Sequence, residues 1–362
     1  MNESDGVQAK SDLSWPEVRD LRSALEYRLL GRSGLSISTI GFGCGSTGGL
    51  FVRGTREEQR AALECAIDGG VNYIDTAAQY GEGVSEQNLG RTIRELGISP
   101  LVGTKIRIRP TEVSDAKKIL RQRIEESLTR LGMSRVDVCT LHTRVGSGSD
   151  ELRAEVVMHV IAPAMRDLVN DGLAGAIGFT GLGQTEELLE VAASGFFDSF
   201  QCYYNLLNQS AHIPGSPDGR SQDFHGLLDL ASSKDTGAIG IRILAGGALA
   251  GDQVRHQTAG AIGQPMAKGE EYTDDVTRAN LYRENLTHFE VDSLSELAYR
   301  FALSNKSLSC VLGGFSDSAQ VLQALDFAKK GPLSVRALAE LKMKGPHFPS
   351  HLTSTPKTGP PM

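Results

Sequence analysis

Four polar residues, Asp75, Tyr80, Lys105 and His142, have side chains that together could move a proton. A free tyrosine has a pKa near ~10 and is a poor base at neutral pH, but a nearby ammonium such as Lys105 favours the phenolate and lowers that pKa. Asp75 would hold the lysine in place and keep it charged, and His142 could donate a hydrogen bond to a substrate oxygen or share in the proton relay. We therefore predict a site in which Tyr80 protonates an alkoxide as a hydride arrives, or deprotonates an alcohol as a hydride leaves.

Each of the four residues also has a plainer interpretation. Asp75 could cap a turn, Tyr80 could be an ordinary loop aromatic, Lys105 a solvated surface lysine and His142 a core histidine. The site is favoured because each residue lies at the C-terminal end of a predicted strand or just beyond it. In a closed barrel of parallel strands these ends face one another around the mouth, where catalysis occurs.

Short apolar runs alternate with helix-period segments along most of the chain. The predicted strands are residues 38–43, 72–75, 101–105, 136–142, 174–180, 199–203, 238–243 and 308–312. The predicted helices are residues 55–68, 85–96, 114–131, 152–171, 185–193, 225–234, 293–304 and 318–329. Eight strand–helix repeats predict a parallel sheet with helical crossovers, and eight is the number that closes into a (β/α)8, or TIM, barrel. The alternative is an open doubly wound sheet, because residues 41–46 contain closely spaced glycines, but no acidic partner follows a second strand at the expected distance.

The remaining segments frame this barrel, which we place at residues 27–344. Residues 1–26 are predicted to be an N-terminal extension with a short helical pattern around 15–25, and residues 345–362 a disordered Pro-rich tail. Two hairpin-like segments, 27–30 and 35–40, could plug the bottom of the barrel. Residues 251–290 are polar, contain glycines and show no strong period, so we predict a long loop after strand seven that acts as a lid or binding loop.

Composition limits the partners of this chain. The net charge of −7 and the pI of about 5.7 argue against a nucleic-acid footprint, and no run approaches the roughly 18 apolar residues of a membrane helix.

The five cysteines include no CxxC pair, so we expect neither a metal site nor a disulfide framework and treat Cys44 and Cys202 as packing residues. Because the chain starts with polar residues and has no signal segment, we predict a cytoplasmic protein. No feature of the sequence indicates the oligomeric state. His212, His225, His256 and His288 lack ligand spacing and are predicted to be surface residues.

The motifs around the four polar residues resemble those of the aldo-keto reductase superfamily. Residues 27–35, YRLLGRSGL, look like the opening of many members, and residues 75–81, DTAAQYG, with the following Ser85-Glu86, are similar to the first family signature. Residues 103–105, GTK, match the lysine strand, residues 141–142 the histidine strand, and residues 201–208, QCYYNLLN, the sixth-strand motif. The resemblance covers roughly residues 27–329. It implies a (β/α)8 barrel, an NAD(P) cofactor and a catalytic tetrad made of Tyr80, Lys105, Asp75 and His142.

The same resemblance implies a cofactor site. Its expected members are Gly45, Ser46, Thr180, Gln201, Arg242, Gly314, Ser316, Ser318 and Gln320. The Ser-Asn pair that the family carries on strand five is replaced here by Thr180-Gly181, as in the galactose-dehydrogenase branch. The aromatic residue that the family often carries on strand seven is also missing, so Arg242 could contact a phosphate or an anionic substrate instead. A hydroxyl at Ser316 and a negative charge at Asp317 stand where NADP-dependent members usually carry a cation, which favours NAD. Arg242 or Lys329 reaching a 2′-phosphate is the alternative, and it would favour NADP.

The leading hypothesis is therefore hydride transfer between NAD(P) and a carbonyl or alcohol, with an aldose or small hydroxyl compound as substrate. A second hypothesis is an NADPH-dependent aldehyde or ketone reductase with the same tetrad. A third belongs to another class: some family members are cofactor-binding regulatory subunits, and the extension before Tyr27 and the Pro-rich tail would then be interaction segments. The intact tetrad argues against a purely regulatory role.

Overall fold

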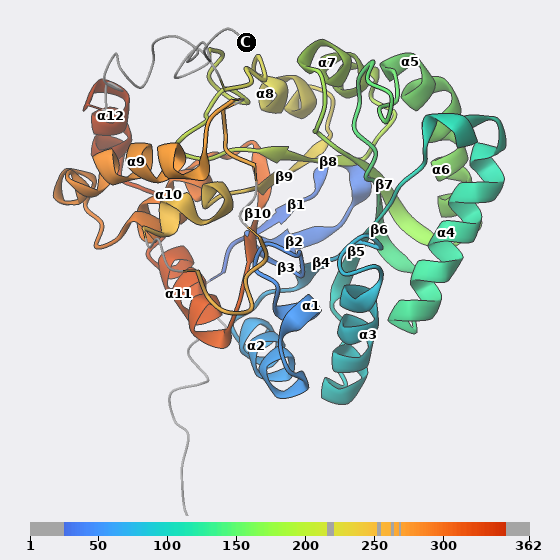
Figure 1. Ribbon diagram of the computed structural model, residues 1–362, viewed down its shortest axis with the longest axis horizontal. Coiled ribbons are helices and arrows are strands. Elements are labelled where there is room, and N and C mark those ends of the chain that lie inside the picture. The colour runs from blue at the N-terminus through green and yellow to red at the C-terminus, as the bar shows by residue number, and fades with distance from the viewer. Residues whose placement is uncertain (1–24, 216–220, 252–254, 262–263, 268, 345–362) are drawn as a thin grey trace, which may run out of the picture.

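Eight parallel strands form a closed barrel at the centre of the molecule (Figure 1). The computed structural model describes residues 25–215, 221–251, 255–261, 264–267 and 269–344. In their order around the barrel the strands are β10 (Leu308–Gly314), β3 (Ile40–Gly43), β4 (Tyr73–Asp75), β5 (Leu101–Ile106), β6 (Val136–Leu141), β7 (Ala174–Thr180), β8 (Ser199–Tyr203) and β9 (Gly237–Ile241). The helical pattern expected around 15–25 and the Pro-rich tail at 345–362 lie outside the described residues, except for Leu25.

The predicted barrel is confirmed and the open-sheet alternative is wrong. The last strand, β10, pairs in parallel with the first, β3, with Val311 opposite Ile40. That pairing leaves no free edge among these strands, which is what separates a barrel from an open sheet.

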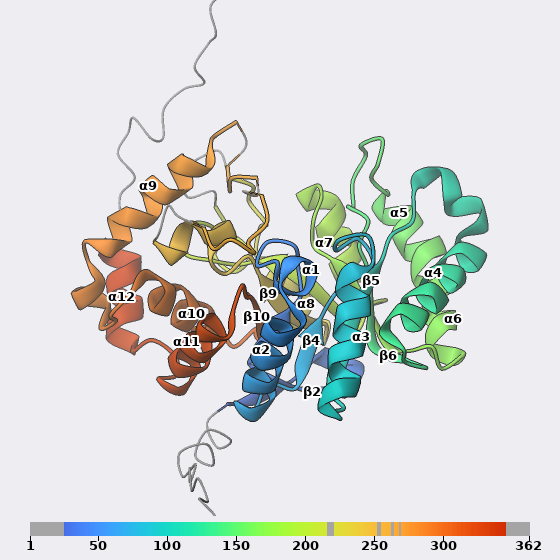
Figure 2. The same cartoon turned by 60° about the horizontal axis from the view of Figure 1, so that its bottom comes forward.

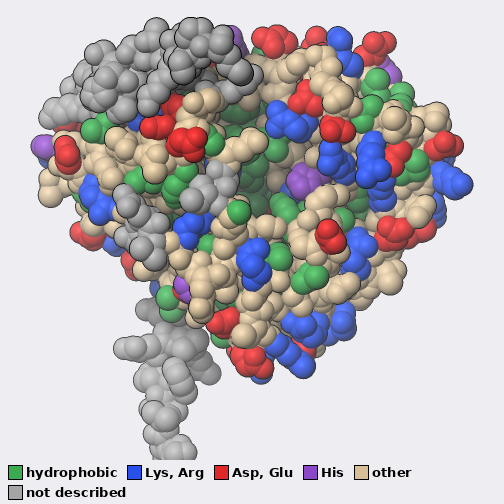
Figure 3. Space-filling view, viewed as in Figure 1, with side chains coloured by type: hydrophobic (Ala, Val, Ile, Leu, Met, Phe, Trp, Pro, Cys, Tyr) green, Lys and Arg blue, Asp and Glu red, His purple; other side chains and the backbone are tan. Residues whose placement is uncertain are grey.

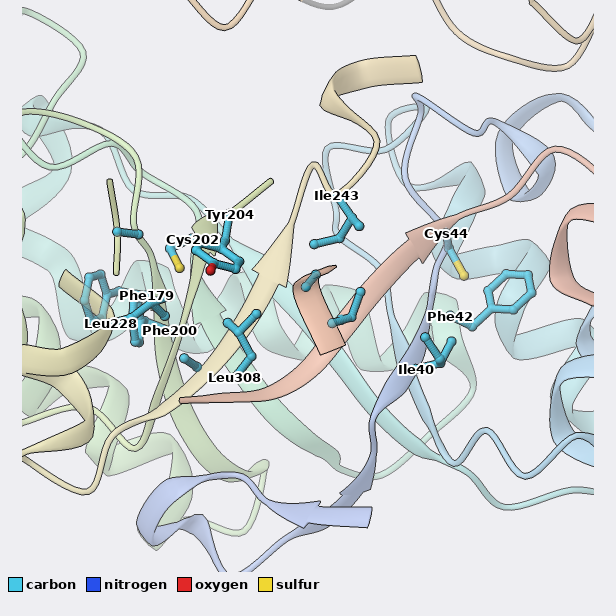
Figure 4. Close-up of a cluster of buried hydrophobic side chains, with 14 of the residues drawn as sticks. Ile40, Phe42, Cys44, Phe179, Phe200, Cys202, Tyr204, Leu228, Ile243 and Leu308 are labelled. Carbon is cyan, nitrogen blue, oxygen red and sulfur yellow. The ribbon is translucent and has the colours of Figure 1, made fainter. Parts of the chain in front are cut away.

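Side chains alternate along each strand between the barrel interior and the layer under the helices. On β8, Phe200 and Cys202 point toward the helices, where Figure 4 shows Phe200 beside Phe179 of β7 and Leu228. The rings of Phe179 and Phe200 stack with centroids 5.6 Å apart. Gln201, between Phe200 and Cys202, is therefore directed into the barrel.

Helices surround the barrel, and most lie where the apolar spacing predicted them. They are α2 (Arg56–Asp68), α3 (Val84–Leu96), α4 (Ala116–Leu131), α6 (Ala162–Asn170), α7 (Thr185–Ser194), α8 (Leu227–Ser232), α10 (Leu294–Ser304) and α11 (Ser318–Lys329), with short α1 (Leu50–Arg53) and α5 (Ala154–Val156). The single helix predicted at 152–171 is instead divided, because a π-helical turn at Val157–Ile161 joins α5 to α6. Helix α1 and two further helices, α9 (Tyr272–Arg283) and α12 (Val335–Lys344), were not predicted.

The prediction that residues 251–290 lack regular structure is wrong for α9. The buried side of this helix includes charged residues: Arg278 is 1% exposed and forms ion pairs of 2.5 Å with both Asp275 and Glu270. A buried charge needs such partners, and a buried face made partly of paired charges leaves no apolar period in the sequence.

An N-terminal hairpin closes the bottom of the barrel, as predicted. Its strands β1 (Tyr27–Leu29) and β2 (Ser36–Ser38) are antiparallel, and Leu30 and Ile37 are buried against Tyr73 and other residues of the barrel interior. The turn requires Gly31, because its φ is +51° and a Cβ there would lie 2.2 Å from the backbone nitrogen of Gly237. Figure 2 shows the hairpin at the opposite end of the molecule from α9.

None of the described helices combines the length and the apolar character that a membrane crossing requires.

Candidate active site

The barrel brings the four predicted catalytic residues together at the C-terminal end of the strands. Asp75 is the last residue of β4, Lys105 lies next to the end of β5, and His142 directly follows β6. Tyr80 lies in the turn between β4 and α3, and all four residues line a cavity of about 660 Å³. Figure 3 shows this face hollowed near its centre, with hydrophobic, basic and histidine side chains around the hollow.

Lys105 and Asp75 form an ion pair inside the barrel. Both side chains are almost fully buried, and the Lys105 ammonium also donates a hydrogen bond of 2.9 Å to the carbonyl of Thr76. Burial by itself lowers the pKa of Lys105, but the negative charge of Asp75 and the interaction with Tyr80 outweigh it, so that the pKa is raised. The lysine is therefore held charged.

Asp75 has further partners on its second carboxylate oxygen. The amide of Gln201 donates to Oδ2 at 2.6 Å, and the hydroxyl of Tyr73 lies 3.5 Å from the same atom. These contacts hold the carboxylate in place, and the carboxylate in turn keeps Lys105 in position.

Tyr80 lies against this ion pair. The Lys105 ammonium is 5.1 Å from the centre of the Tyr80 ring. Burial raises the pKa of Tyr80 by more than Lys105 lowers it, so the expectation that the lysine would bring this pKa below its usual value is wrong. At neutral pH the hydroxyl is a neutral donor, which suits protonation of a substrate oxygen.

His142 completes the group. Its ring lies edge-on to the Tyr80 ring, with centroids 5.9 Å apart, and its Nδ1 is 2.7 Å from Oε1 of Gln79. Burial, assisted by the charges of Lys105 and Arg107, lowers the pKa of His142 to about 3. The imidazole is therefore neutral at physiological pH.

The cavity extends from these residues to β10 and the N-terminal end of α11. Seven of the nine expected cofactor residues line it: Gly45, Thr180, Gln201, Arg242, Gly314, Ser316 and Gln320. Ser46 and Ser318 do not. The carbonyl of Ser46 accepts a hydrogen bond of 2.5 Å from Arg53, and Ser318 is the first residue of α11.

Two hydroxyl groups that line the cavity already donate hydrogen bonds to backbone carbonyls. The hydroxyl of Thr180 donates to the carbonyl of Leu141 at 3.0 Å, and that of Ser316 donates to the carbonyl of Gly48 at 2.7 Å. Since each hydroxyl has used its single proton, both oxygens remain available to a ligand as acceptors.

Two arginines give this cavity a positive character. Arg242 has a left-handed backbone (φ +55°), its guanidinium lies 5.1 Å from the centre of the Tyr203 ring, and it donates to the carbonyl of Gln264 at 2.6 Å. Arg255 donates to the carbonyl of Gly246 at 2.7 Å. Among the described residues, neither arginine has an ion pair with a carboxylate. The diphosphate of a nicotinamide dinucleotide is an anion that fits such a surplus of positive charge.

The long loop contributes residues that the sequence patterns did not single out. Arg255, His256, Gln264 and Tyr272 all line the cavity, which confirms that the segment after strand seven shapes the pocket. His256, predicted to be a surface residue, keeps 31% of its side chain exposed but also lines the cavity, and its Nε2 lies 3.4 Å from Asp317 at the start of α11. The position of the loop was the only signal for these residues, since their types follow no motif.

Cys44 and Cys202 are buried packing residues, as predicted. Burial raises the pKa of both thiols, which keeps them protonated and poorly nucleophilic.

Comparison with known proteins agrees with this architecture. The model of the aldo/keto reductase family matches residues 39–345. L-galactose dehydrogenase of Arabidopsis thaliana is 27% identical over 314 residues, which cover 82% of this chain and 86% of that protein. D-threo-aldose 1-dehydrogenase of a Pseudomonas species is 26% identical over 323 residues, with coverage of 82% and 91% respectively.

Solved structures share the fold at lower identity. An aldo/keto reductase from Klebsiella pneumoniae, in complex with NADP and acetate, has a TM-score of 0.61 and 20% identity, with 91% of this chain and 96% of that chain covered. The family match spans most of the chain, and the relatives that cover most of it include dehydrogenases and a reductase. The chain therefore belongs to the aldo/keto reductase family and is an NAD(P)-dependent oxidoreductase.

Proposed function

We propose that this enzyme interconverts an aldose or small hydroxyl compound and the corresponding carbonyl compound, with Tyr80, Lys105, Asp75 and His142 as its catalytic residues. The observation that carries this proposal is the position of the Lys105 ammonium, which pairs with Asp75 and lies 5.1 Å from the centre of the Tyr80 ring. A bound nicotinamide cofactor would supply or accept the hydride.

The protein residues would manage the proton. In reduction, the neutral Tyr80 hydroxyl donates its proton to the substrate oxygen, and Lys105 stabilises the phenolate that remains. In oxidation, the Tyr80 hydroxyl must first release its proton to solvent, and the phenolate stabilised by Lys105 then takes the proton of the substrate alcohol. Asp75 keeps Lys105 charged in both directions, and the buried position of Lys105 shields this charge from water.

The substrate class follows from the relatives that span most of the chain. Two of them are named for the oxidation of L-galactose and of D-threo-aldoses, and the strand-five turn at Thr180-Gly181 resembles the galactose-dehydrogenase branch. A regulatory subunit is not favoured, because these relatives are enzymes.

The test is a panel of aldoses and polyols with NAD, followed through formation of the reduced nicotinamide. Turnover of at least one aldose at a rate well above that of simple alkanols would support the proposal. Turnover confined to simple aldehydes, with NADPH as the reductant, would replace it with the second candidate.

That second candidate, an NADPH-dependent aldehyde or ketone reductase, has one structural observation in its favour. The loop adds Arg255 and His256 to the lining of the cavity, and His256 lies 3.4 Å from Asp317 at the start of α11. A cation such as Arg255 at this end would favour a 2′-phosphate. A titration of the purified protein with NADH and NADPH side by side, followed by protein fluorescence, decides between the cofactors: tighter NADH binding supports the dehydrogenase, and tighter NADPH binding supports the reductase.

A further inference from the structure

Gln79 lies directly before Tyr80 and contacts His142 through a single hydrogen bond. Its side-chain oxygen Oε1 is 2.7 Å from Nδ1 of the imidazole. The family resemblance assigns no role to this glutamine, and the mechanism proposed above does not use it.

The hydrogen bond determines which ring nitrogen carries the proton. An amide carbonyl oxygen only accepts, so Nδ1 of His142 must be the donor. The imidazole is neutral, because its pKa is lowered to about 3 by burial and by the nearby cations. A neutral imidazole has one N–H, and therefore Nε2 carries a lone pair and can only accept a hydrogen bond.

Gln79 and His142 line different cavities. Gln79 lines a second, smaller cavity of about 220 Å³, together with Arg107 and Arg123, and does not line the main cavity. His142 lines the main cavity beside Tyr80. With Nδ1 directed to Gln79, the opposite side of the ring, which includes Nε2, is left for the main cavity and its substrate.

We propose that Gln79 is a positioning residue that holds His142 as its Nδ1–H tautomer, so that Nε2 accepts a hydrogen bond from a hydroxyl of the substrate. A carbonyl oxygen has only lone pairs, so it gains a hydrogen bond from Tyr80 but none from Nε2. A substrate with a hydroxyl on the carbon next to its carbonyl satisfies both groups at once. The inferred preference is thus for 2-hydroxy aldehydes and for the corresponding vicinal diols; this preference rests on the proposed function, whereas the tautomer does not.

The tautomer is tested first by nitrogen-15 NMR of histidine-labelled protein at pH 8, with and without added NADH. His142→Asn identifies the signals by removing them. The wild type is expected to show a protonated Nδ1 and an unprotonated Nε2 at His142. Gln79→Met should remove this preference, whereas Gln79→Glu, whose carboxylate also accepts, should retain it. An Nε2–H signal at His142 in the wild type, or the same tautomer in wild type and Gln79→Met, would overturn the proposal.

The substrate preference is tested with matched aldehydes, 2-hydroxypropanal and propanal. The kcat/KM of the wild type is expected to be roughly tenfold higher for the hydroxy aldehyde than for propanal, because one additional hydrogen bond stabilises a complex by about this factor. Gln79→Met should reduce this ratio toward one, Gln79→Glu should restore it, and Gln87→Met, an exposed glutamine on α3, should leave it unchanged. A ratio that does not differ between wild type and Gln79→Met would overturn the inferred preference. Failure of the wild type to turn over any aldehyde or alcohol would reject the proposed function and this preference with it, while the NMR result still decides the tautomer.

Discussion

Gln201 on β8 donates a hydrogen bond of 2.6 Å to Asp75 on β4, the strand diametrically opposite in the barrel. The same carboxylate forms the ion pair with Lys105 through its other oxygen. One of the residues expected to contact the cofactor is thus joined to the ion pair that lies against Tyr80. Binding of the cofactor and the charge state of the proposed catalytic group should therefore depend on each other.

Replacement of Gln201 by Leu tests this connection. The variant loses the donor to Asp75 and an amide that is expected to contact the cofactor, so we expect both the Kd for the preferred nicotinamide cofactor and kcat to worsen by roughly tenfold. Fluorescence titration measures the first and steady-state kinetics the second. Gln87→Leu, on the exposed side of α3, is the matched control. A change in Kd with no change in kcat would show that the bond to Asp75 has no role in turnover.

Replacement of Tyr80 by Phe removes only the hydroxyl that would carry the proton. We expect turnover to fall by roughly 100- to 10,000-fold, the usual contribution of a general acid or base, while cofactor affinity stays within about twofold of the wild type. Tyr27→Phe, in the hairpin at the far end of the barrel, should retain full activity. Turnover of Tyr80→Phe at the rate of the wild type would exclude Tyr80 as the proton donor.

Replacement of Lys105 by Met leaves the buried Asp75 without its counter-charge. Such a change costs about 3–5 kcal/mol of folding free energy, which urea denaturation followed by circular dichroism would measure. The double variant Lys105→Met with Asp75→Asn should regain most of this stability, because the buried charge is gone, but should remain inactive. If the double variant is as unstable as the single one, the loss comes from packing and not from the unpaired carboxylate.

Protonation of His142 should make stability depend on pH. In the unfolded chain this histidine takes up a proton near pH ~6.5, whereas in the folded protein it does so only near a pKa of about 3. The unfolded state binds more protons between these two pKa values. The contribution of His142 to the free energy of unfolding is therefore fully present above pH ~6.5 and is lost as the pH falls toward ~3. Urea midpoints measured across this range should fall less steeply for His142→Asn than for the wild type. His288→Asn, which replaces an exposed histidine, should keep the slope of the wild type, and equal slopes for all three proteins would contradict the assignment.

Asp317 allows a test of cofactor choice that changes charge alone. It caps α11 by accepting a hydrogen bond of 2.8 Å from the backbone of Gln320, and asparagine caps helices equally well. Asp317→Asn should therefore keep the fold but improve the affinity for NADPH relative to NADH by roughly three- to tenfold, because one negative charge near the expected 2′-phosphate is removed. Asp326→Asn, farther along the same helix and 63% exposed, is the control. An unchanged affinity ratio would mean that the adenosine end of the cofactor does not lie near Asp317.

The sequence by itself determined the barrel and the identity of the four proposed catalytic residues. Strand and helix periods are local properties, so the order of eight strands and their helices could be predicted without coordinates. Thr55 and Glu58 form a capping box that begins α2 beside its predicted start at residue 55. The positions of Asp75, Lys105 and His142 followed from the ends of predicted strands, because barrel topology brings those ends together.

Only the tertiary structure decided the properties that depend on burial and on contacts between distant residues. The position of Lys105 suggested a lowered pKa for Tyr80, but the extent of burial, which no local pattern reports, raises it. The partner of Gln201 lies 126 residues away in the chain, and that of His142 lies 63 residues away. Helix α9 and the placement of His256 escaped prediction for the same reason: their environment consists of paired charges and loop contacts that form only once the chain has folded.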